Sequence, residues 1–302
     1  MTRSDVMDFL LLSAIWGASF LLLRVATPEF GPLALIGLRS GLAALCLLPL
    51  LWLREGRDGW ANVAAHAGPM AVLGVTNALL PFTLLAYATL SLSAGFTALI
   101  NASTPLWAAI VGLVWLRAGL SAAQWLGLAL GVVGMVILTW GKVDFRPGGS
   151  GLAVVAGLVA TLAYGFSTHF AKRKVTAVSP LGVAAGSQTT GALMLLPFVL
   201  TYWPATTPSA TAWIAAVLLA VLATAFALII YFRLIARLGG QKAATVTFLI
   251  PVFAIAWGAV FLGEGVTGLM LAGGAVVLAG TGLTLGWSGS AALRPGKFRQ
   301  SP

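Results

Sequence analysis

The chain has 302 residues, of which 60% are apolar and only 8% are charged, whereas about a quarter of the residues of a soluble domain are charged. This composition excludes an ordinary water-soluble domain, and the continuous apolar runs exclude an outer-membrane barrel, whose strands alternate. The 17 Lys and Arg against 7 Asp and Glu give a net charge of +10, which suits a nucleic-acid binder only where the basic residues form one face.

Ten apolar runs of about 20 residues follow one another along the chain, and a run of this length crosses a bilayer as a helix. Each run is bounded by charges, proline or glycine. The sequence therefore predicts an all-α polytopic membrane protein with ten transmembrane helices. We expect these helices at residues 7–26, 33–53, 69–88, 93–116, 122–140, 152–170, 181–202, 213–234, 243–262 and 267–287.

The basic residues are distributed unevenly between the two sides of the membrane that the predicted connections define. The tails and the even-numbered connections hold 13 of them, and the odd-numbered connections with their flanks hold Arg24, Lys142 and Arg146. Because Lys and Arg are retained on the cytoplasmic side, this asymmetry predicts that both termini are cytoplasmic. It also explains the positive charge without a nucleic-acid partner, and it makes anionic membrane lipid the expected partner of these side chains.

The two halves of the chain repeat one another. A shift of 148 residues aligns Trp16-Gly17 with Tyr164-Gly165 and Ser19 with Ser167. A shift of 146 residues aligns four later positions, namely Pro105 with Pro251, Gly119 with Gly265, Gly127 with Gly273 and Gly134 with Gly280. We interpret residues 1–146 and 147–287 as two copies of a five-helix repeat, followed by a disordered cytoplasmic tail at residues 288–302.

A repeat of five helices makes an odd number of membrane crossings, so the second copy enters the membrane from the opposite side. Inverted repeats are typical of alternating-access transporters, which bind substrate near the bilayer midplane between the halves. A membrane scaffold or a membrane enzyme built on a duplicated fold is the alternative.

The sequence contains none of the catalytic motifs that we considered. There is no H-E-x-x-H motif and no phosphate-binding loop. Cys46 is the one cysteine; we expect it in the core, and it can form neither an intrachain disulfide nor a thiolate metal cluster. The sequence thus predicts no enzymatic activity, no metal and no cofactor.

Residues of the second copy resemble a known repeat. The stretch from Pro251 through Phe261-Leu262-Gly263-Glu264-Gly265 to Gly273 and Gly280 resembles the end of the EamA-type repeat of the drug/metabolite transporter superfamily. Residues 15–20 and 32–39 resemble the opening helices of that repeat. The resemblance covers residues 7–287 in two copies, but Ala118 stands where the second copy has Glu264, so any role of this glutamate is asymmetric.

More narrowly, the chain is similar to the bacterial aromatic amino acid exporters of that superfamily. This resemblance implies a transporter of the bacterial inner membrane that exports aromatic and other neutral amino acids. Members of this branch also pass methyl viologen, so a broad amine or drug exporter of the same fold is the second interpretation.

Polar and aromatic side chains at depth in the bilayer are the candidates for a substrate cavity, because they are costly unless paired or facing a cavity. Trp16 and Tyr164 are repeat equivalents near the middle of their helices, where their rings can stack on a planar side chain or contact an ammonium group. Core packing is the alternative. Ser19 and Ser167 lie on the same helix faces, although each hydroxyl can instead bond a backbone carbonyl one turn back.

Three further helices combine a proline with a polar residue. Proline frees a backbone carbonyl, and a nearby amide or hydroxyl can bond what is freed or bind a ligand. Such interrupted helices line substrate sites or act as hinges in transporters. The candidates are Thr76 and Asn77 with Pro81, Asn101 with Pro105, and Thr247 with Pro251, the prolines being assigned to a hinge or gate.

Arg39 lies six residues into the second predicted helix, about 9 Å from its end at 1.5 Å per residue. At that depth the guanidinium should face protein or water. It can bind a substrate carboxylate with two hydrogen bonds, or it can brace a gate by bonding helix-end carbonyls. The resembling family commonly carries an arginine here whatever its substrate, which favours the gate.

All seven acidic residues fall in connections or at the ends of predicted helices, whereas proton-coupled pumps usually place a carboxylate at depth. We therefore expect facilitated export rather than tight ion coupling. A lining of Trp, Tyr, Ser, Thr and Asn suits a small zwitterionic solute, and we expect the protein to function as a monomer.

Overall fold

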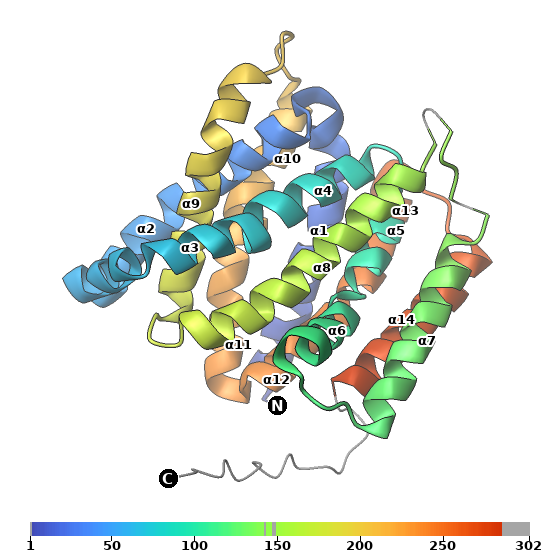
Figure 1. Ribbon diagram of the computed structural model, residues 1–302. Helices are drawn as coiled ribbons and strands as arrows, with labels where there is room; N and C mark the ends of the chain where they lie inside the picture. Colours follow the sequence, from blue (N-terminus) through green and yellow to red (C-terminus); the bar gives the residue numbers. More distant parts are fainter. Residues whose placement is uncertain (1, 142, 147–148, 286–302) are drawn as a thin grey trace, which may run out of the picture.

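The computed structural model describes residues 2–141, 143–146 and 149–285. This part of the chain is helical and contains no strand (Figure 1). The expected tail at residues 288–302 and the end of the last predicted helix lie outside it. The first half comprises α1 (Arg3–Phe30), α2 (Pro32–Ala65), α3 (Ala67–Leu73), the π-helix η1 (Gly74–Leu79), α4 (Leu80–Thr89), α5 (Ala94–Asn101), α6 (Thr104–Leu116) and α7 (Ala122–Thr139).

The second half follows the same plan. It comprises α8 (Gly151–Lys174), α9 (Pro180–Thr201), α10 (Ala210–Ala220), the π-helix η2 (Val221–Phe226), α11 (Ala227–Leu238), α12 (Gly240–Ala244), the 3-10 helix η3 (Thr245–Phe248), α13 (Ile250–Leu262) and α14 (Gly268–Thr284). Several of these elements join end to end into one membrane crossing, as α3, η1 and α4 do.

The predicted number of crossings is confirmed. Among the described residues, nine apolar helical segments have at least 18 residues, and a tenth, Gly268–Thr284, has 17, which is also enough to span a bilayer. Residues 54–65 were expected in a connection, but α2 continues through them, with a break at Gly56, whose φ is +60°. That prediction was wrong because the charged residues end the apolar run but do not prevent a helix, and the chain is helical up to Glu55 and again from Arg57 to Ala65.

The two halves pack as an inverted pair. α7 lies against α14 at one side of the bundle, and α2 lies against α9 at the other (Figure 1). A Cβ added to Gly127 would lie 2.7 Å from the carbonyl oxygen of Gly280, and one added to Gly134 would lie 3.0 Å from that of Gly273. Since Gly127 is the repeat equivalent of Gly273 and Gly134 that of Gly280, the contacts are exchanged between copies, as a two-fold axis requires.

The first helix of each half packs into the other half. α1 lies against α13, and α8 lies against α6. A Cβ on Gly17 would lie 3.0 Å from the backbone nitrogen of Ala254, and one on Gly165 would lie 2.8 Å from that of Ala108. These two repeat-equivalent glycines therefore allow backbone contact between the halves on both sides of the two-fold axis.

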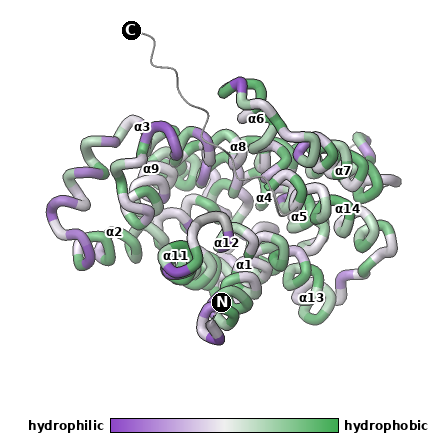
Figure 2. The backbone as a smooth tube through the Cα atoms, turned by 90° about the horizontal axis from the view of Figure 1, so that it is seen from below, coloured by the Kyte–Doolittle hydropathy of each residue, from purple (hydrophilic) through white to green (hydrophobic). Residues whose placement is uncertain are grey.

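Hydrophobic residues cover most of the helices, and hydrophilic residues gather at the N-terminus and beside α3 and α11 (Figure 2). We call the end of the bundle where α1 begins the near end and the opposite one the far end. Cys46 was expected in the core but is exposed on α2. The prediction failed because apolar residues on both faces of a membrane helix leave the lipid-facing side unmarked.

Candidate functional site

Aromatic rings from the two halves meet halfway along the bundle. Trp16 lies at the middle of α1, and its ring centre is 5.2 Å from that of Tyr231 in α11. Tyr164 lies at the middle of α8, with its ring centre 6.2 Å from that of Phe82 in α4. The two predicted residues thus each face an aromatic ring of the opposite half, in the tilted or edge geometries that such pairs prefer.

Arg39 extends into the same interface. Its residue surface is only 6% exposed, its Nε donates a 3.0 Å hydrogen bond to Oγ1 of Thr224 in η2, and its Cζ lies 3.7 Å from the centre of the Phe82 ring. Within the described residues, no carboxylate lies within 4.0 Å of it. An unpaired buried cation costs several kcal/mol, and a desolvated aromatic face offsets about 2 kcal/mol of that.

Two π-helical segments stand at equivalent positions. η1 and η2 begin at residues 74 and 221 and end at 79 and 226, so one shift of 147 residues relates them. π-Helical turns are rare and occur frequently at functional sites. η1 carries the predicted residues Thr76 and Asn77. In η2, Thr224 donates from Oγ1 to the carbonyl of Leu219 at 2.9 Å, which leaves its oxygen free to accept from Arg39.

Each predicted hinge proline occupies the second residue of a helix that resumes after an interruption. Pro81 follows η1 at the start of α4. Pro105 begins α6 after the turn at residues 102–103, and Pro251 begins α13 after η3. At Pro105 and Pro251 proline is tolerated because the first turn of a helix leaves its N–H groups unpaired. α4 directly continues η1, so the missing N–H of Pro81 removes one backbone hydrogen bond from the crossing. The prolines therefore mark the breaks, and their role as hinges stays a prediction.

Three predicted cavity residues bond their own helices. The hydroxyls of Ser19, Thr76 and Thr247 donate to backbone carbonyls three or four residues earlier, at 3.4, 2.8 and 2.9 Å. This is the local bonding typical of membrane serine and threonine. A substrate contact by these hydroxyls stays a prediction, and it would use the remaining oxygen lone pairs.

The other predicted polar residues differ in burial. Asn101 is the last residue of α5, and its Oδ1 is buried without a hydrogen-bond partner among the described residues. Ser167 is buried in α8, and Asn77 is half-buried in η1. An unpartnered buried carbonyl calls for a donor, so Asn101 is the strongest of the three as a ligand contact.

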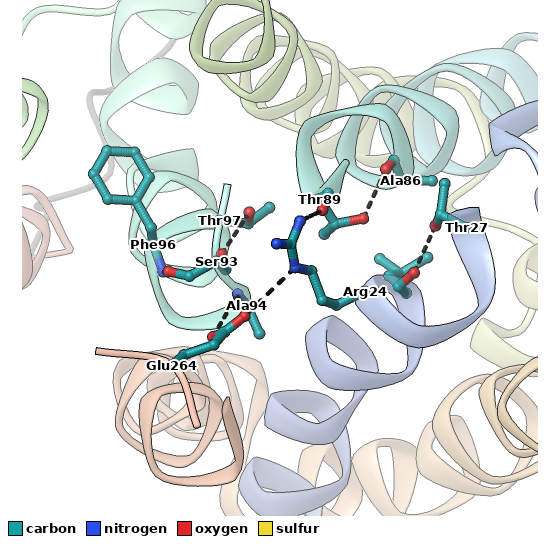
Figure 3. A network of polar contacts seen from close by, with 10 residues as sticks. Arg24, Thr27, Ala86, Thr89, Ser93, Ala94, Phe96, Thr97 and Glu264 are labelled. Atoms are coloured by element: carbon teal, nitrogen blue, oxygen red, sulfur yellow. Dashed lines mark hydrogen bonds and ion pairs between the residues drawn. The ribbon is translucent and has the colours of Figure 1, made fainter. Parts of the chain in front are cut away.

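A polar network joins the halves at the far end (Figure 3). Glu264, in the connection between α13 and α14, accepts from the backbone N–H of Ala94 at the start of α5, with distances of 3.0 and 2.9 Å to its two oxygens. Nε of Arg24 lies 3.6 Å from Glu264 Oε1. Nη1 of the same arginine donates a hydrogen bond to the carbonyl of Thr89. The carboxylate also suits the positive N-terminus of α5.

A second set of ion pairs joins the halves at the near end. Asp8 lies 3.5 Å from Arg233, and Asp5 lies 3.6 Å from Arg237, so α1 is tied to α11. The two arginine side chains are 48% and 47% exposed, so each pair contributes little to stability. Among the described residues, no group of three or more His, Cys, Asp or Glu is placed to hold a metal ion.

The side chains that contact the predicted site residues were not predicted from the sequence. The shift of 148 residues that aligns Trp16 with Tyr164 pairs Thr76 with Thr224, and the shift of 147 that relates η1 to η2 pairs Asn77 with it. Under either shift the repeat contained a signal for Thr224. Phe82 and Tyr231 carried none, because aromatic residues are common throughout these apolar helices. The Arg24 and Glu264 pair was also missed, since the two residues lie far apart in the sequence.

Among the described residues, ten apolar crossings in two inverted halves, with aromatic and polar side chains from both halves between them, are typical of the class of multi-pass membrane transporters. The model of the EamA-like transporter family matches residues 6–140 and again residues 151–286. The chain therefore belongs to this family, as the sequence resemblance predicted.

Curated bacterial relatives match nearly the whole chain. It is 27% identical over 298 residues to a "probable amino-acid metabolite efflux pump" of Salmonella typhimurium, across 93% of this chain and 94% of that one. It is 27% identical over 268 residues to a "probable terminal-alkyne amino-acid exporter" of Streptantibioticus cattleyicolor, across 88% of each. An uncharacterized inner membrane transporter of Escherichia coli is 24% identical over 279 residues, across 90% of this chain and 88% of that one.

A solved crystal structure shares the fold. The two superpose with a TM-score of 0.63 across 94% of this chain and 96% of the other, at 16% sequence identity. At that identity the likeness concerns the fold alone.

Proposed function

We propose that this protein exports aromatic and other neutral amino acids across the bacterial inner membrane by alternating access. The names of two relatives support the substrate class, since one is an amino-acid metabolite efflux pump and the other an amino-acid exporter. A third relative is named as an inner membrane transporter, which supports the membrane.

The observation that best supports the proposal is that aromatic rings from both halves and the guanidinium of Arg39 lie at the interface between the halves. Phe82 lies against the guanidinium of the buried Arg39 and faces the ring of Tyr164. Trp16 and Tyr231 form a second aromatic pair between the two copies. Aromatic faces suit a planar side chain, and a cation suits a carboxylate. Together they match an aromatic amino acid better than a broad organic cation such as methyl viologen, which the guanidinium would repel.

Alternating access is supported by contacts at the far end. There α5 packs on α13, with Gly95 against Ile255, and the Glu264 network ties the same two regions. In the proposed orientation, with both termini cytoplasmic, this is the external end. The external path to the site is then closed by contacts between the halves, and it opens when they separate.

The remaining parts of the proposal follow the charge distribution. Transport is facilitated rather than tightly coupled to ions, because all seven acids lie at helix ends, in connections or in the extension of α2. The solute is a small zwitterion, the basic connections face anionic lipid, and one copy of the chain contains the complete site.

Uptake by purified protein in liposomes tests the function. Labelled tryptophan, phenylalanine and alanine are offered to the parent, to Trp16→Ala and Tyr164→Ala, and to Trp125→Ala as a control on the exposed surface of α7. We expect tryptophan uptake to fall at least about tenfold in the two site variants, since each loses a ring contact worth about 1 kcal/mol together with its apolar area. The control should stay within about twofold.

Two results would contradict the proposal. A parent that moves none of the three amino acids would overturn amino-acid transport. Site variants that match the parent for every substrate would overturn the aromatic site while leaving transport in place.

A further inference from the structure

Arg39 is a buried cation that forms no ion pair with a described residue. It is 6% exposed, and the ion pairs of the described residues involve Arg24, Arg233 and Arg237 but not Arg39. A buried guanidinium is stable only when an anion or several acceptors match it. The surroundings of Arg39 are therefore incomplete in the absence of an anionic group.

Two contacts hold the guanidinium and leave its outer edge available. Nε donates a 3.0 Å hydrogen bond to Oγ1 of Thr224, and Cζ lies 3.7 Å from the centre of the Phe82 ring. The terminal nitrogens Nη1 and Nη2 donate no hydrogen bond to a described residue. These two nitrogens form the fork that pairs with both oxygens of a carboxylate.

The position of this fork is between the halves. Arg39 and Phe82 belong to the first half, and Thr224 belongs to the second. Tyr164 of the second half faces Phe82 with ring centres 6.2 Å apart. A ligand paired with the fork is consequently close to both copies and to the aromatic rings of the candidate site.

We propose that Arg39 binds the carboxylate of the substrate through Nη1 and Nη2, with Thr224 and Phe82 fixing the direction of the guanidinium. This inference rests on the proposed function. It assigns the specificity for carboxylate-bearing solutes to one residue, and it assigns Thr224 a positioning role. The other role considered for Arg39, bracing a gate through helix-end carbonyls, has no such hydrogen bond among the described residues.

The second copy provides no equivalent cation. The repeat equivalent of Arg39 is Ser187, a buried serine that bonds the carbonyl of Ala184 in its own helix at 3.2 Å. One substrate carboxylate therefore meets one cation, and the asymmetry defines which end of a zwitterion faces α2.

Competition against labelled L-phenylalanine tests this assignment. The competitors are unlabelled L-phenylalanine and L-phenylalaninamide, which keeps the ring and the amine but lacks the carboxylate. In the parent we expect the amide to compete at least about 30-fold more weakly. In Arg39→Gln this ratio should fall to within about threefold, since a site built for a hydrogen-bonding group rejects the analogue that lacks it. A ratio is insensitive to the amount of folded protein.

Thr224 gives an independent test that keeps the cation. Thr224→Val removes the acceptor of Nε and should lower the ratio at least about threefold, whereas Thr224→Ser keeps the hydroxyl and should retain the parent ratio. These variants decide the question where Arg39→Gln does not fold.

The outcomes separate the two proposals. An unchanged ratio in Arg39→Gln, or in Thr224→Val where the first variant is not folded, overturns the carboxylate site while amino-acid transport stands. A parent that neither binds nor transports labelled phenylalanine overturns the proposed function itself.

Discussion

Position 264 and its repeat equivalent 118 share a backbone and differ in side chain. Each follows a left-handed residue, Gly263 with φ +63° and Arg117 with φ +51°. Each N–H donates to the carbonyl six residues earlier at 3.1 Å. Because the copies are inverted, the two turns lie at opposite ends of the bundle. The carboxylate of Glu264 therefore connects the two halves at the far end. Ala118, at the near end, has no carboxylate that could form the equivalent contact.

Removing the carboxylate should cost more than removing its cation. Glu264→Ala leaves the N–H of Ala94 without its charged acceptor, which costs about 2 kcal/mol. Arg24→Gln removes an ion pair whose arginine is 34% exposed, worth less than about 1 kcal/mol, and the amide can still donate to Thr89. Melting temperatures of the purified variants in detergent check this order. An equal or larger decrease for Arg24→Gln would contradict it.

At the residue scale, the repeat located Trp16 and Tyr164 but not the side chains they contact. Tyr231 and Phe82 reach them from the equivalent helices α11 and α4, but the shift of 148 residues pairs Phe82 with Ile230, so the alignment did not mark either ring. The choice of rotamer and the tilt between helices determine such contacts. Neither is contained in hydropathy or in the spacing of residues along one helix.

Interruptions within the crossings were only partly predictable. Pro81, Pro105 and Pro251 lie at the breaks, since proline removes a backbone hydrogen bond. Proline alone is not a sufficient signal, because Pro28, Pro49 and Pro197 lie inside α1, α2 and α9. The π-helical form of η1 and η2 had no signal, since hydropathy marks a membrane crossing and not which backbone hydrogen bonds form within it. The extension of α2 was missed for a related reason: charges mark the end of a membrane crossing and not the end of a helix.

Contact between α7 and α14 depends on glycine at their crossing. A Cβ on Gly134 would lie 2.6 Å from the backbone nitrogen of Val277, so Gly134→Ala should push the helices apart and lower the melting temperature. Gly41→Ala in α2 is the matched control, because nothing lies within 4 Å of its added Cβ. Alanine is favoured in a helix by about 0.5–1 kcal/mol, so the control should be unchanged or more stable. Equal shifts for both variants would refute close packing at this crossing.

The architecture of the whole molecule could be predicted from the number of apolar runs and the length of the repeat. Ten crossings and a five-helix repeat require inversion, and the exchanged contacts of Gly127 and Gly134 with Gly280 and Gly273 agree with it. Whether each end of the bundle is open or closed could not be predicted in this way. It depends on contacts such as that between Arg24 and Glu264, which are 240 residues apart and which form only when the halves have assembled.

Facilitated transport predicts flux without an ion gradient. Uptake of labelled phenylalanine into liposomes should reach the same initial rate when the proton and sodium gradients are collapsed by ionophores, because no carboxylate of the described residues lies midway along a crossing. Protein-free liposomes provide the background. Strict dependence on either gradient would show that coupling uses another group.

The most direct test of alternating access is to lock the far end. A Cβ on Gly258 would lie 3.6 Å from the Cβ of Ala94, within the range of about 3.5–4.5 Å that a disulfide requires. Ala94→Cys and Gly258→Cys, combined with Cys46→Ser, should form a bond between α5 and α13 on oxidation. Counterflow of labelled phenylalanine should then stop and should return on reduction, with each single cysteine variant unaffected by oxidant. Because a Cβ on Gly258 also displaces a carboxylate oxygen of Glu264, the reduced double variant provides the reference rate. Full counterflow in the oxidised protein, with the bond verified by mass, would contradict movement of the two halves.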